Sequence, residues 1–319
     1  MTSRRQILRI FAATSIAQSV SAWAQEPRKI PRVGFVAPSA VAEQRFNLFR
    51  QGLRELGYVE GKNIQLELRA GGNPKLLKDA AAELVQQKVD VIATVFGAAS
   101  DGAKQSTKEI PIVLAPMGDA VAQGFVTNLA KPGGNITGVS INAAEAAGKA
   151  LEVMRETMPR ARRVAALADS TESFSKIFVE QLQSTAKQLG KELHPIMLKG
   201  PTEMNAALPG LLKMRPDIAI VHPSLGPPTA DLVLKQRIAT AAPSSVFADT
   251  CLVTYSADIP DVYRMAADYV DRILKGAKAG ELPVRQPTKF ELIVNLKAAR
   301  ALGITVPQSV LLRATRVIE

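Results

Sequence analysis

The sequence has few of the residues from which catalytic and metal sites are most often built. Among its 319 residues are one cysteine, Cys251, and two histidines, His194 and His222, each followed by proline. One cysteine cannot form an intramolecular disulfide, and two histidines on separate predicted strands supply neither a metal-ligand set nor a Ser–His–Asp arrangement. No glycine-rich phosphate-binding motif or G-x-S-x-G sequence follows a predicted strand. We therefore expect a binding protein with no catalytic residue, cofactor or metal, rather than an enzyme.

Aromatic residues and concentrated positive charge are also scarce. Phe, Trp and Tyr make up 5% of the chain, and the formal net charge of +11 is scattered apart from a group at residues 160–163. No basic helix with interleaved aromatic residues is present, which argues against a nucleic-acid-binding protein. We expect a solvated basic surface, and attraction of anionic solutes to it remains open.

No apolar run is long enough to span a bilayer as a helix, which needs about 20 residues. One short apolar run at residues 10–20 follows a basic head at residues 3–9 and precedes an A-x-A pattern at residues 22–24. A basic head, a short apolar middle and small residues before a cleavage site predict a secretory signal peptide over residues 1–24.

This signal also predicts where the protein works. Arg4 and Arg5 favour the twin-arginine route, which exports folded proteins, and an ordinary secretory leader is the alternative. No cysteine lies at the cleavage site, so we expect no lipid anchor there. A free exported protein is retained where an outer membrane encloses it. We therefore predict a monomer in the periplasm.

Short β-branched runs alternate with longer amphipathic stretches after Pro31. The pattern predicts strands at residues 32–36, 63–69, 89–95, 110–114, 136–141, 163–168, 192–198, 217–221, 245–248 and 290–294. It predicts helices at residues 43–56, 75–87, 98–107, 120–129, 144–158, 174–189, 204–214, 232–240, 259–274 and 297–302. Such alternation is typical of βαβ units and parallel sheets.

The alternation runs through two series, and the part after residue 259 is too small for a core of its own. We therefore predict an α/β protein with two doubly wound parallel-sheet lobes joined by a hinge. Ligands of open α/β sheets bind at the carboxyl ends of the strands, so we expect a cleft there.

Small and hydroxyl residues recur just past the predicted strand ends. They allow backbone N–H groups and helix amino termini to approach an anionic group such as a ligand carboxylate. Ordinary helix capping uses the same residue types and is the alternative for any single position. With two aromatic residues of the expected cleft added, the candidate ligand-binding residues are Ser39, Phe96, Gly97, Ala98, Ala99, Asp119, Ser140, Ser170, Ser173, Ser224, Asp249 and Tyr255.

Five segments resemble a known family. They are Leu-Gly-Tyr-Val-Glu-Gly-Lys-Asn-Ile at residues 56–64, Ile-Pro-Ile-Val at 110–113, Leu-Ala-Lys-Pro-Gly-Gly-Asn-Ile-Thr-Gly-Val-Ser at 129–140, Tyr-Val-Asp-Arg-Ile-Leu-Lys-Gly at 269–276 and Leu-Pro-Val-Arg-Gln-Pro-Thr-Lys-Phe-Glu-Leu at 282–292. From about residue 31 to residue 319, the chain resembles the ABC-transporter substrate-binding proteins of the TrpX-like type.

The resemblance implies a type I periplasmic-binding-protein fold with a three-crossover hinge. The N-terminal lobe is expected at residues 30–140 plus 256–288, and the C-terminal lobe at residues 141–255 plus 289–319. Members bind small amino acids, often aromatic, and hand them to a membrane permease with a cytoplasmic ATPase. The candidates above match the family's cleft loops, within which residues 169–173 form one loop, and Ser140 and Tyr255 match two of the crossings.

Two segments depart from the family pattern. Residues 244–256 are shorter than the family's loop and lack its Glu and Gly-Gly pair, and Asp119-Ala120 replaces the usual Asp-Pro. Both departures fall at cleft positions, so the resemblance does not identify the solute.

We expect the solute-binding component of an ABC importer, which captures an amino acid or related organic acid. A ligand-sensing protein that presents its solute to a membrane receptor is the alternative, and an exported hydrolase is a third possibility.

Overall fold

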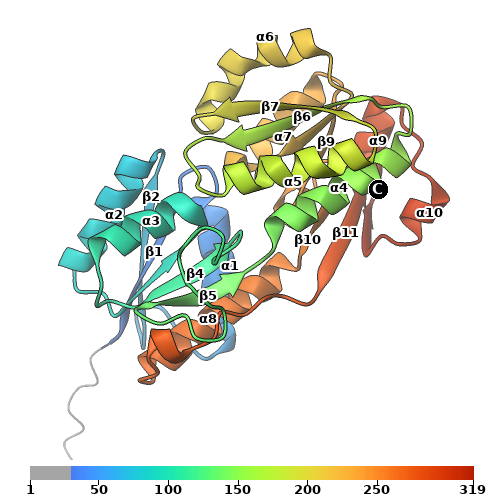
Figure 1. Ribbon diagram of the computed structural model, residues 1–319. Helices are drawn as coiled ribbons and strands as arrows, with labels where there is room; N and C mark the ends of the chain where they lie inside the picture. The colour runs from blue at the N-terminus through green and yellow to red at the C-terminus, as the bar shows by residue number, and fades with distance from the viewer. Residues whose placement is uncertain (1–29) are drawn as a thin grey trace, which may run out of the picture. The chain divides into compact units, whose positions relative to one another are not determined.

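The computed structural model describes residues 30–319, and the predicted signal peptide lies outside this range. The described residues form two β-sheets, each covered by helices on both faces (Figure 1). No helix among them is both long enough and apolar enough to cross a bilayer. The predicted α/β fold with two doubly wound lobes is confirmed.

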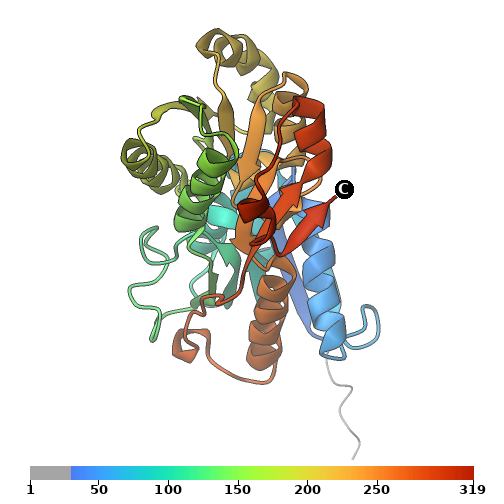
Figure 2. The ribbon, with the colours of Figure 1, turned by 90° about the vertical axis from the view of Figure 1, so that its right-hand side faces the viewer.

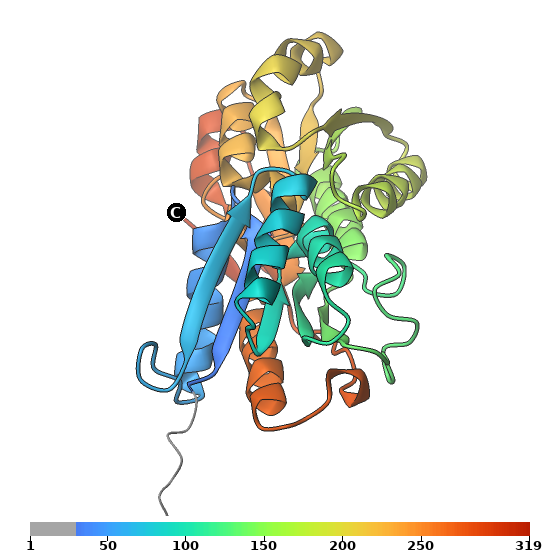
Figure 3. The same cartoon turned by 90° about the vertical axis from the view of Figure 1, so that its left-hand side faces the viewer.

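The first sheet has five parallel strands in the order β2-β1-β3-β4-β5. The strands are β1 (Arg32–Pro38), β2 (Gln65–Gly71), β3 (Val91–Thr94), β4 (Ile112–Met117) and β5 (Ile136–Ser140). Helices α1 (Ala42–Glu55) and α8 (Ile259–Leu274) pack against one face. Helices α2 (Pro74–Gln86) and α3 (Phe96–Ser106) pack against the other, where Figure 3 shows them toward the viewer.

The second sheet has seven strands in the order β12-β11-β10-β9-β8-β6-β7. The strands are β6 (Arg163–Asp169), β7 (Glu192–Leu198), β8 (Ile218–Val221), β9 (Ala239–Ala242), β10 (Val253–Ala257), β11 (Phe290–Asn295) and β12 (Arg316–Ile318). Only the β10–β11 pair is antiparallel among these described strands. Figure 2 faces the side of this lobe on which β11 and β12 lie.

Helices cover both faces of the second sheet as well. Those on one face include α4 (Ala143–Thr157) and α5 (Ser175–Gln188), and those on the other are α6 (Met204–Met214) and α7 (Gly226–Lys235). The shorter helices α9 (Leu296–Leu302) and α10 (Gln308–Leu311) follow β11. Short 3-10 helices are η2 (Pro201–Glu203), η3 (Pro223–Leu225), η4 (Ser245–Phe247) and η5 (Ala279–Glu281).

The two lobes share one strand order, because β2-β1-β3-β4-β5 recurs as β7-β6-β8-β9-β10. The correspondence extends to single hydrogen bonds: Ser39 N–H donates to Gly71 O in one lobe, and Ser170 N–H donates to Leu198 O in the other. The chain passes between the sheets after β5, after β10 and before β11. We keep as a proposal the lobe boundaries expected from the sequence, which this sheet membership supports.

Local sequence explains several element boundaries. Helix α8 begins after Asp258, whose carboxylate accepts a hydrogen bond from Asp261 N–H, and Pro260 occupies its first turn. Helix α9 begins after Asn295, which caps Ala298 N–H, and ends at Gly303 in the left-handed conformation. The short strands β3 and β8 are buried along their whole length, as expected for parallel strands covered on both faces.

Three predicted elements are wrong. Residues 120–129 form a turn rather than a helix, with Gly124 at a φ of +72°. The predicted strand at residues 245–248 is mostly the 3-10 helix η4. The strand of that region is β9, and its first two residues, Ala239 and Thr240, fall in the helix that was predicted at residues 232–240. Helix α7 instead begins at Gly226 with two prolines in its first turn, and it ends before β9.

Candidate functional site

The carboxyl ends of the two sheets meet directly across the junction between the lobes. Glu172 follows β6, and its Oε2 accepts hydrogen bonds from the backbone N–H groups of Gly97 (2.7 Å) and Ala98 (3.1 Å) at the start of α3. Beside them, the Gln123 side-chain amide donates to Ser173 Oγ at 2.8 Å. These contacts hold the two lobes in a closed arrangement.

Two glycines make this closure possible. A Cβ atom on Gly97 would lie 2.4 Å from Ser173 Oγ, and one on Gly118 would lie 2.7 Å from the Phe174 ring. Both glycines belong to the first lobe, and their neighbours belong to the second. Side chains at these two positions would therefore force the lobes apart.

Phe96 precedes Gly97 at the first position of α3 and is 8% exposed. Its φ of +64° places a bulky residue in the left-handed region, which costs free energy and occurs mostly where the surrounding structure enforces it. This conformation lies at the junction of the lobes, beside the contact between Gly97 and Glu172.

Glu172 is buried together with a second acidic residue. Burial first and the nearby Asp169 carboxyl second raise the pKa of the Glu172 carboxyl to about 8, although the hydrogen bonds from the Ala98 and Gly97 amides oppose the shift. Near neutral pH the Glu172 carboxyl therefore holds its proton, and it caps the start of α3 as a neutral hydrogen-bond acceptor.

Asp169, the last residue of β6, anchors a buried hydrogen-bond network. Its Oδ2 accepts from Ser224 Oγ (2.8 Å), and its Oδ1 accepts from Thr171 Oγ1 (2.6 Å). His222 Nδ1 lies 2.9 Å from Ser224 Oγ, but the single hydroxyl proton of Ser224 goes to Asp169. This geometry positions the loops and does not activate Ser224 as a nucleophile.

His222 stays neutral in this network. Burial lowers its pKa to about 4, although the Asp169 carboxylate opposes the shift. The imidazole lies 5.6 Å from the Phe174 ring and 5.1 Å from the Phe178 ring, centroid to centroid. His222 therefore packs among buried aromatic side chains next to the junction.

The structure brings some predicted site residues together and separates others. Phe96, Gly97, Ala98 and Ser173 meet at the junction of the lobes, and Ser224 lies in the network behind them. The Asp119 carboxylate accepts hydrogen bonds from the N–H groups of Val121 and Ala122, so it stabilises a local turn. Four other positions lie outside the junction: Ser39, Ser170 and Asp249 are exposed, and Ala99 is packed in the apolar core beneath α3.

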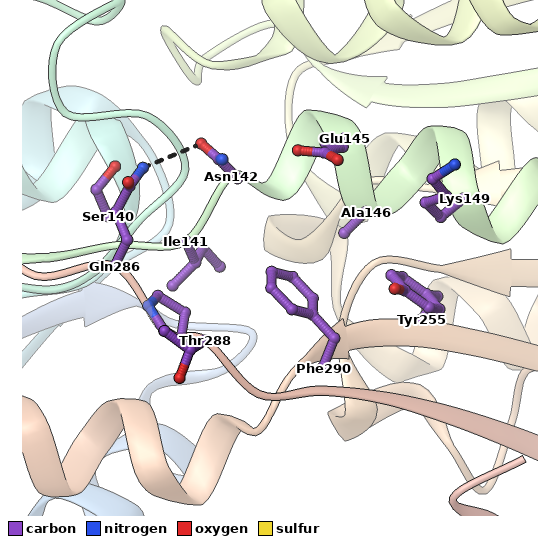
Figure 4. Close-up of a pocket in the computed structure, with 11 residues that line it drawn as sticks. Ser140, Ile141, Asn142, Glu145, Ala146, Lys149, Tyr255, Gln286, Thr288 and Phe290 are labelled. Atoms are coloured by element: carbon purple, nitrogen blue, oxygen red, sulfur yellow. Dashed lines mark hydrogen bonds between the residues drawn. The ribbon is translucent and has the colours of Figure 1, made fainter.

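Ser140 and Tyr255 line a separate pocket beside the hinge, with a volume of about 290 Å³ (Figure 4). The Tyr255 ring stacks on Phe290 with centroids 5.9 Å apart. Asn142 and Gln286, on the first and third crossings, are joined by a 3.4 Å hydrogen bond. This pocket adjoins the crossings, and its lining contains none of the residues that close the junction.

Sequence reasoning did not single out three residues of the junction. Glu172 lies in the recognised loop at residues 169–173 but was not chosen as a candidate, and Gln123 falls in the segment at residues 120–129 that was wrongly predicted to be a helix. Arg45 donates from Nη2 to Ser244 Oγ across the lobes at 3.2 Å. The sequence pattern that could have identified Arg45 is its spacing: it lies four residues before Phe49 and therefore on the buried face of α1, where a charged residue is unusual. The described residues contain no group of three or more His, Cys, Asp or Glu side chains arranged for a metal.

Comparison with known proteins gives consistent results. The profile of the family described as ABC transporter substrate binding protein matches residues 35–318. A tyrosine-binding protein of Clostridioides difficile (strain R20291) is 26% identical over 269 residues, which cover 80% of this chain and 75% of that protein.

Two solved structures share the fold. A conserved domain protein from Vibrio cholerae superposes with a TM-score of 0.83 at 23% identity, covering 91% of this chain and 100% of the other. An ABC domain from Streptococcus pneumoniae in complex with L-Trp superposes with a TM-score of 0.82 at 24% identity, covering 90% of this chain and 99% of the other.

Proposed function

We propose, because this chain belongs to the family of ABC transporter substrate binding proteins, that it captures a small carboxylate-bearing solute between its two lobes. The chain is a solute-binding protein rather than an enzyme, as are the family and the relatives found. An amino acid or a related organic acid is the proposed class of solute.

The contact of Glu172 with Gly97 and Ala98 is the observation that carries this proposal. It joins the strand ends of both lobes, where open α/β sheets bind ligands. A solute that enters between the lobes meets the Phe96 ring and the polar loops that follow the strands of both sheets. An aromatic ring and hydrogen-bonding groups from both lobes suit a small amino acid or a related organic acid.

The names of two similar proteins support the same solute class. One is a tyrosine-binding protein, and the other was solved with L-Trp. Amino acids with aromatic side chains therefore come first in a ligand screen, and aliphatic amino acids and organic acids follow.

We further propose that the protein works in the periplasm, exported by the signal at residues 1–24, and delivers its solute to a membrane permease with a cytoplasmic ATPase. The solute would shift an equilibrium between open and closed lobes toward the closed form, to the extent that it binds this form more tightly. The permease would then distinguish the loaded receptor by its closed shape.

A thermal-shift and calorimetric screen of the purified protein against amino acids and organic acids tests this function. We expect at least one solute to raise the unfolding midpoint in a concentration-dependent manner and to bind with one-to-one stoichiometry. Small-angle scattering with and without that solute measures lobe closure. Absence of stabilisation by every solute of both classes contradicts the proposal.

A further inference from the structure

Arg45 is a buried cation with no anionic partner among residues 30–319, which the structure describes. Its side chain is 1% exposed, and no other arginine or lysine among residues 30–319 is fully buried. Its Nη2 atom donates to Ser244 Oγ, whereas Nε and Nη1 have no hydrogen-bond partner in the described part of the chain. Arg32 and Arg285, which are also partly buried, pair with Glu67 and Asp268 respectively.

Aromatic contacts compensate the buried charge only in part. The guanidinium carbon lies 5.8 Å from the centroid of the Phe96 ring and 6.0 Å from that of Tyr263. Such contacts stabilise a cation, but an isolated buried charge costs several kcal/mol unless it is paired and hydrogen-bonded. The arrangement therefore orients the guanidinium and leaves two of its nitrogens for an anion.

Arg45 lies at the edge of the sheets where ligands bind. It is in the first turns of α1, which follows the carboxyl end of β1. Phe96 follows β3, and Ser244 follows β9 of the other lobe. The bond between Arg45 and Ser244 spans 199 residues and joins the two lobes, so an anion held there would contact both.

The backbone donors expected to bind a solute carboxylate already have an occupant in the closed structure. The N–H groups of Gly97 and Ala98 are bonded to Glu172. Beside Phe96, the buried Arg45 guanidinium still has two nitrogens, Nε and Nη1, without a hydrogen-bond partner in the described part of the chain. A guanidinium presents N–H groups in a planar fork that matches the two oxygens of a carboxylate.

We propose that Arg45 binds the carboxylate of the solute and that the protein therefore selects solutes with a free carboxylate over their neutral analogues. This inference rests on the proposed function and deepens it. Ser244 supplies a hydroxyl from the second lobe, so carboxylate binding at Arg45 favours closure. Sugars, polyols and carboxamides lack the anionic group and are excluded.

The test compares the Arg45→Met and Arg45→Lys variants with Arg50→Met as a matched control. Arg50 is on the same helix and lies 5.7 Å from the Phe46 ring, but it is partly exposed and pairs with Glu60. The probes are L-tryptophan and L-tyrosine with their carboxamides, L-tryptophanamide and L-tyrosinamide, in isothermal calorimetry. Circular dichroism checks that each variant is folded. If Arg45→Met does not fold, Arg45→Lys, which keeps the positive charge, provides the comparison.

The wild type and Arg50→Met should bind the acid about 10-fold to 100-fold more tightly than the amide, the range of a charged hydrogen bond. Arg45→Met should lose this preference, and Arg45→Lys, which lacks the fork, should keep only part of it. An acid-to-amide ratio in folded Arg45→Met or Arg45→Lys equal to that of the wild type overturns the inference, while the proposed function stands.

A second probe separates the inference from the proposed function. Sodium acetate, exchanged for sodium chloride at constant ionic strength, should raise the unfolding midpoint of the wild type and Arg50→Met but not of Arg45→Met. The anion site is overturned if acetate does not raise the unfolding midpoint of the wild type, or if it raises the midpoint of Arg45→Met by the same amount. Protection by acetate together with failure of every solute in the screen would leave the anion site and contradict the solute-capture function.

Discussion

Glu172 caps the amino terminus of α3 from the opposite lobe, with its Oε2 2.7 Å from the backbone nitrogen of Gly97. The α3 amino terminus was expected to receive a ligand carboxylate, and in the closed structure a carboxyl group of the protein occupies it. The free N–H groups at a helix amino terminus hydrogen-bond an oxygen acceptor whatever its source. A solute carboxylate that approached this point would have to displace Glu172, which is one reason to look to Arg45 instead.

The first prediction concerns the pH dependence of stability. Because burial and Asp169 raise the pKa of Glu172 from 4.5 to about 8, the folded protein holds a proton that the unfolded chain has lost. The free energy of unfolding should therefore fall as the pH rises from about 4.5 to about 8. Glu172→Gln should remove this contribution between pH 6.5 and 8. Denaturant unfolding of both proteins across that interval measures the difference, and parallel profiles would contradict the prediction.

His222 should act in the opposite direction at lower pH. Its pKa is lowered from 6.5 to about 4, so the unfolded chain binds a proton that the folded protein excludes. Its contribution to stability is fully present above pH 6.5 and is lost as the pH falls toward 4. In NMR spectra, the His222 ring resonances should not titrate between pH 5.5 and 8. A midpoint near 6.5 would show that the ring is not buried as described.

Gly97→Ala should impair closure of the lobes. The added Cβ would lie 2.4 Å from Ser173 Oγ, and overpacking of this kind typically costs about 1–3 kcal/mol. Solute affinity should fall by about 5-fold to 150-fold, the change in the dissociation constant that this range of free energy corresponds to. Calorimetry with whichever solute the screen identifies makes the measurement.

Gly210→Ala is the control for that variant. Gly210 lies in α6, and a Cβ there meets no atom within 4 Å. The substitution should leave affinity unchanged and, if anything, stabilise the helix. Equal affinities of the Gly97 and Gly210 variants would mean that the contact between the lobes does not limit binding.

Cys251 should be chemically inert in the folded protein. Its thiol is buried, and burial raises its pKa to about 12, whereas the thiolate is the reactive form. Iodoacetamide at pH 8 should leave the native protein unlabelled and should modify it fully in guanidinium chloride. Rapid labelling without denaturant would show that the region around β9 and β10 opens readily.

Periodicity in the sequence predicted much of the fold correctly. Strand β7 and helices α6 and α8 have the predicted bounds, since each shows a pattern of its own period over many residues. Strand β9 did not follow the rule: Ala-Thr-Ala-Ala lacks β-branched residues apart from threonine and has no exposed face to alternate with. Its strand conformation depends on the hydrogen bonds that it makes with β8 and β10.

The candidate site, too, could be predicted from the sequence only in part. The loops after the strands, together with Phe96 and Gly97 at the start of α3, could be identified along the chain, because the carboxyl edge of a parallel sheet follows from the order of its elements. The pairs Glu172–Gly97 and Arg45–Ser244 could not be, since they join residues 75 and 199 positions apart. Local patterns record which residues are buried within a lobe. Which polar groups face each other depends on how the two lobes close: in the described residues the Glu172 carboxyl caps α3, and the Arg45 guanidinium has a hydroxyl but no anion beside it.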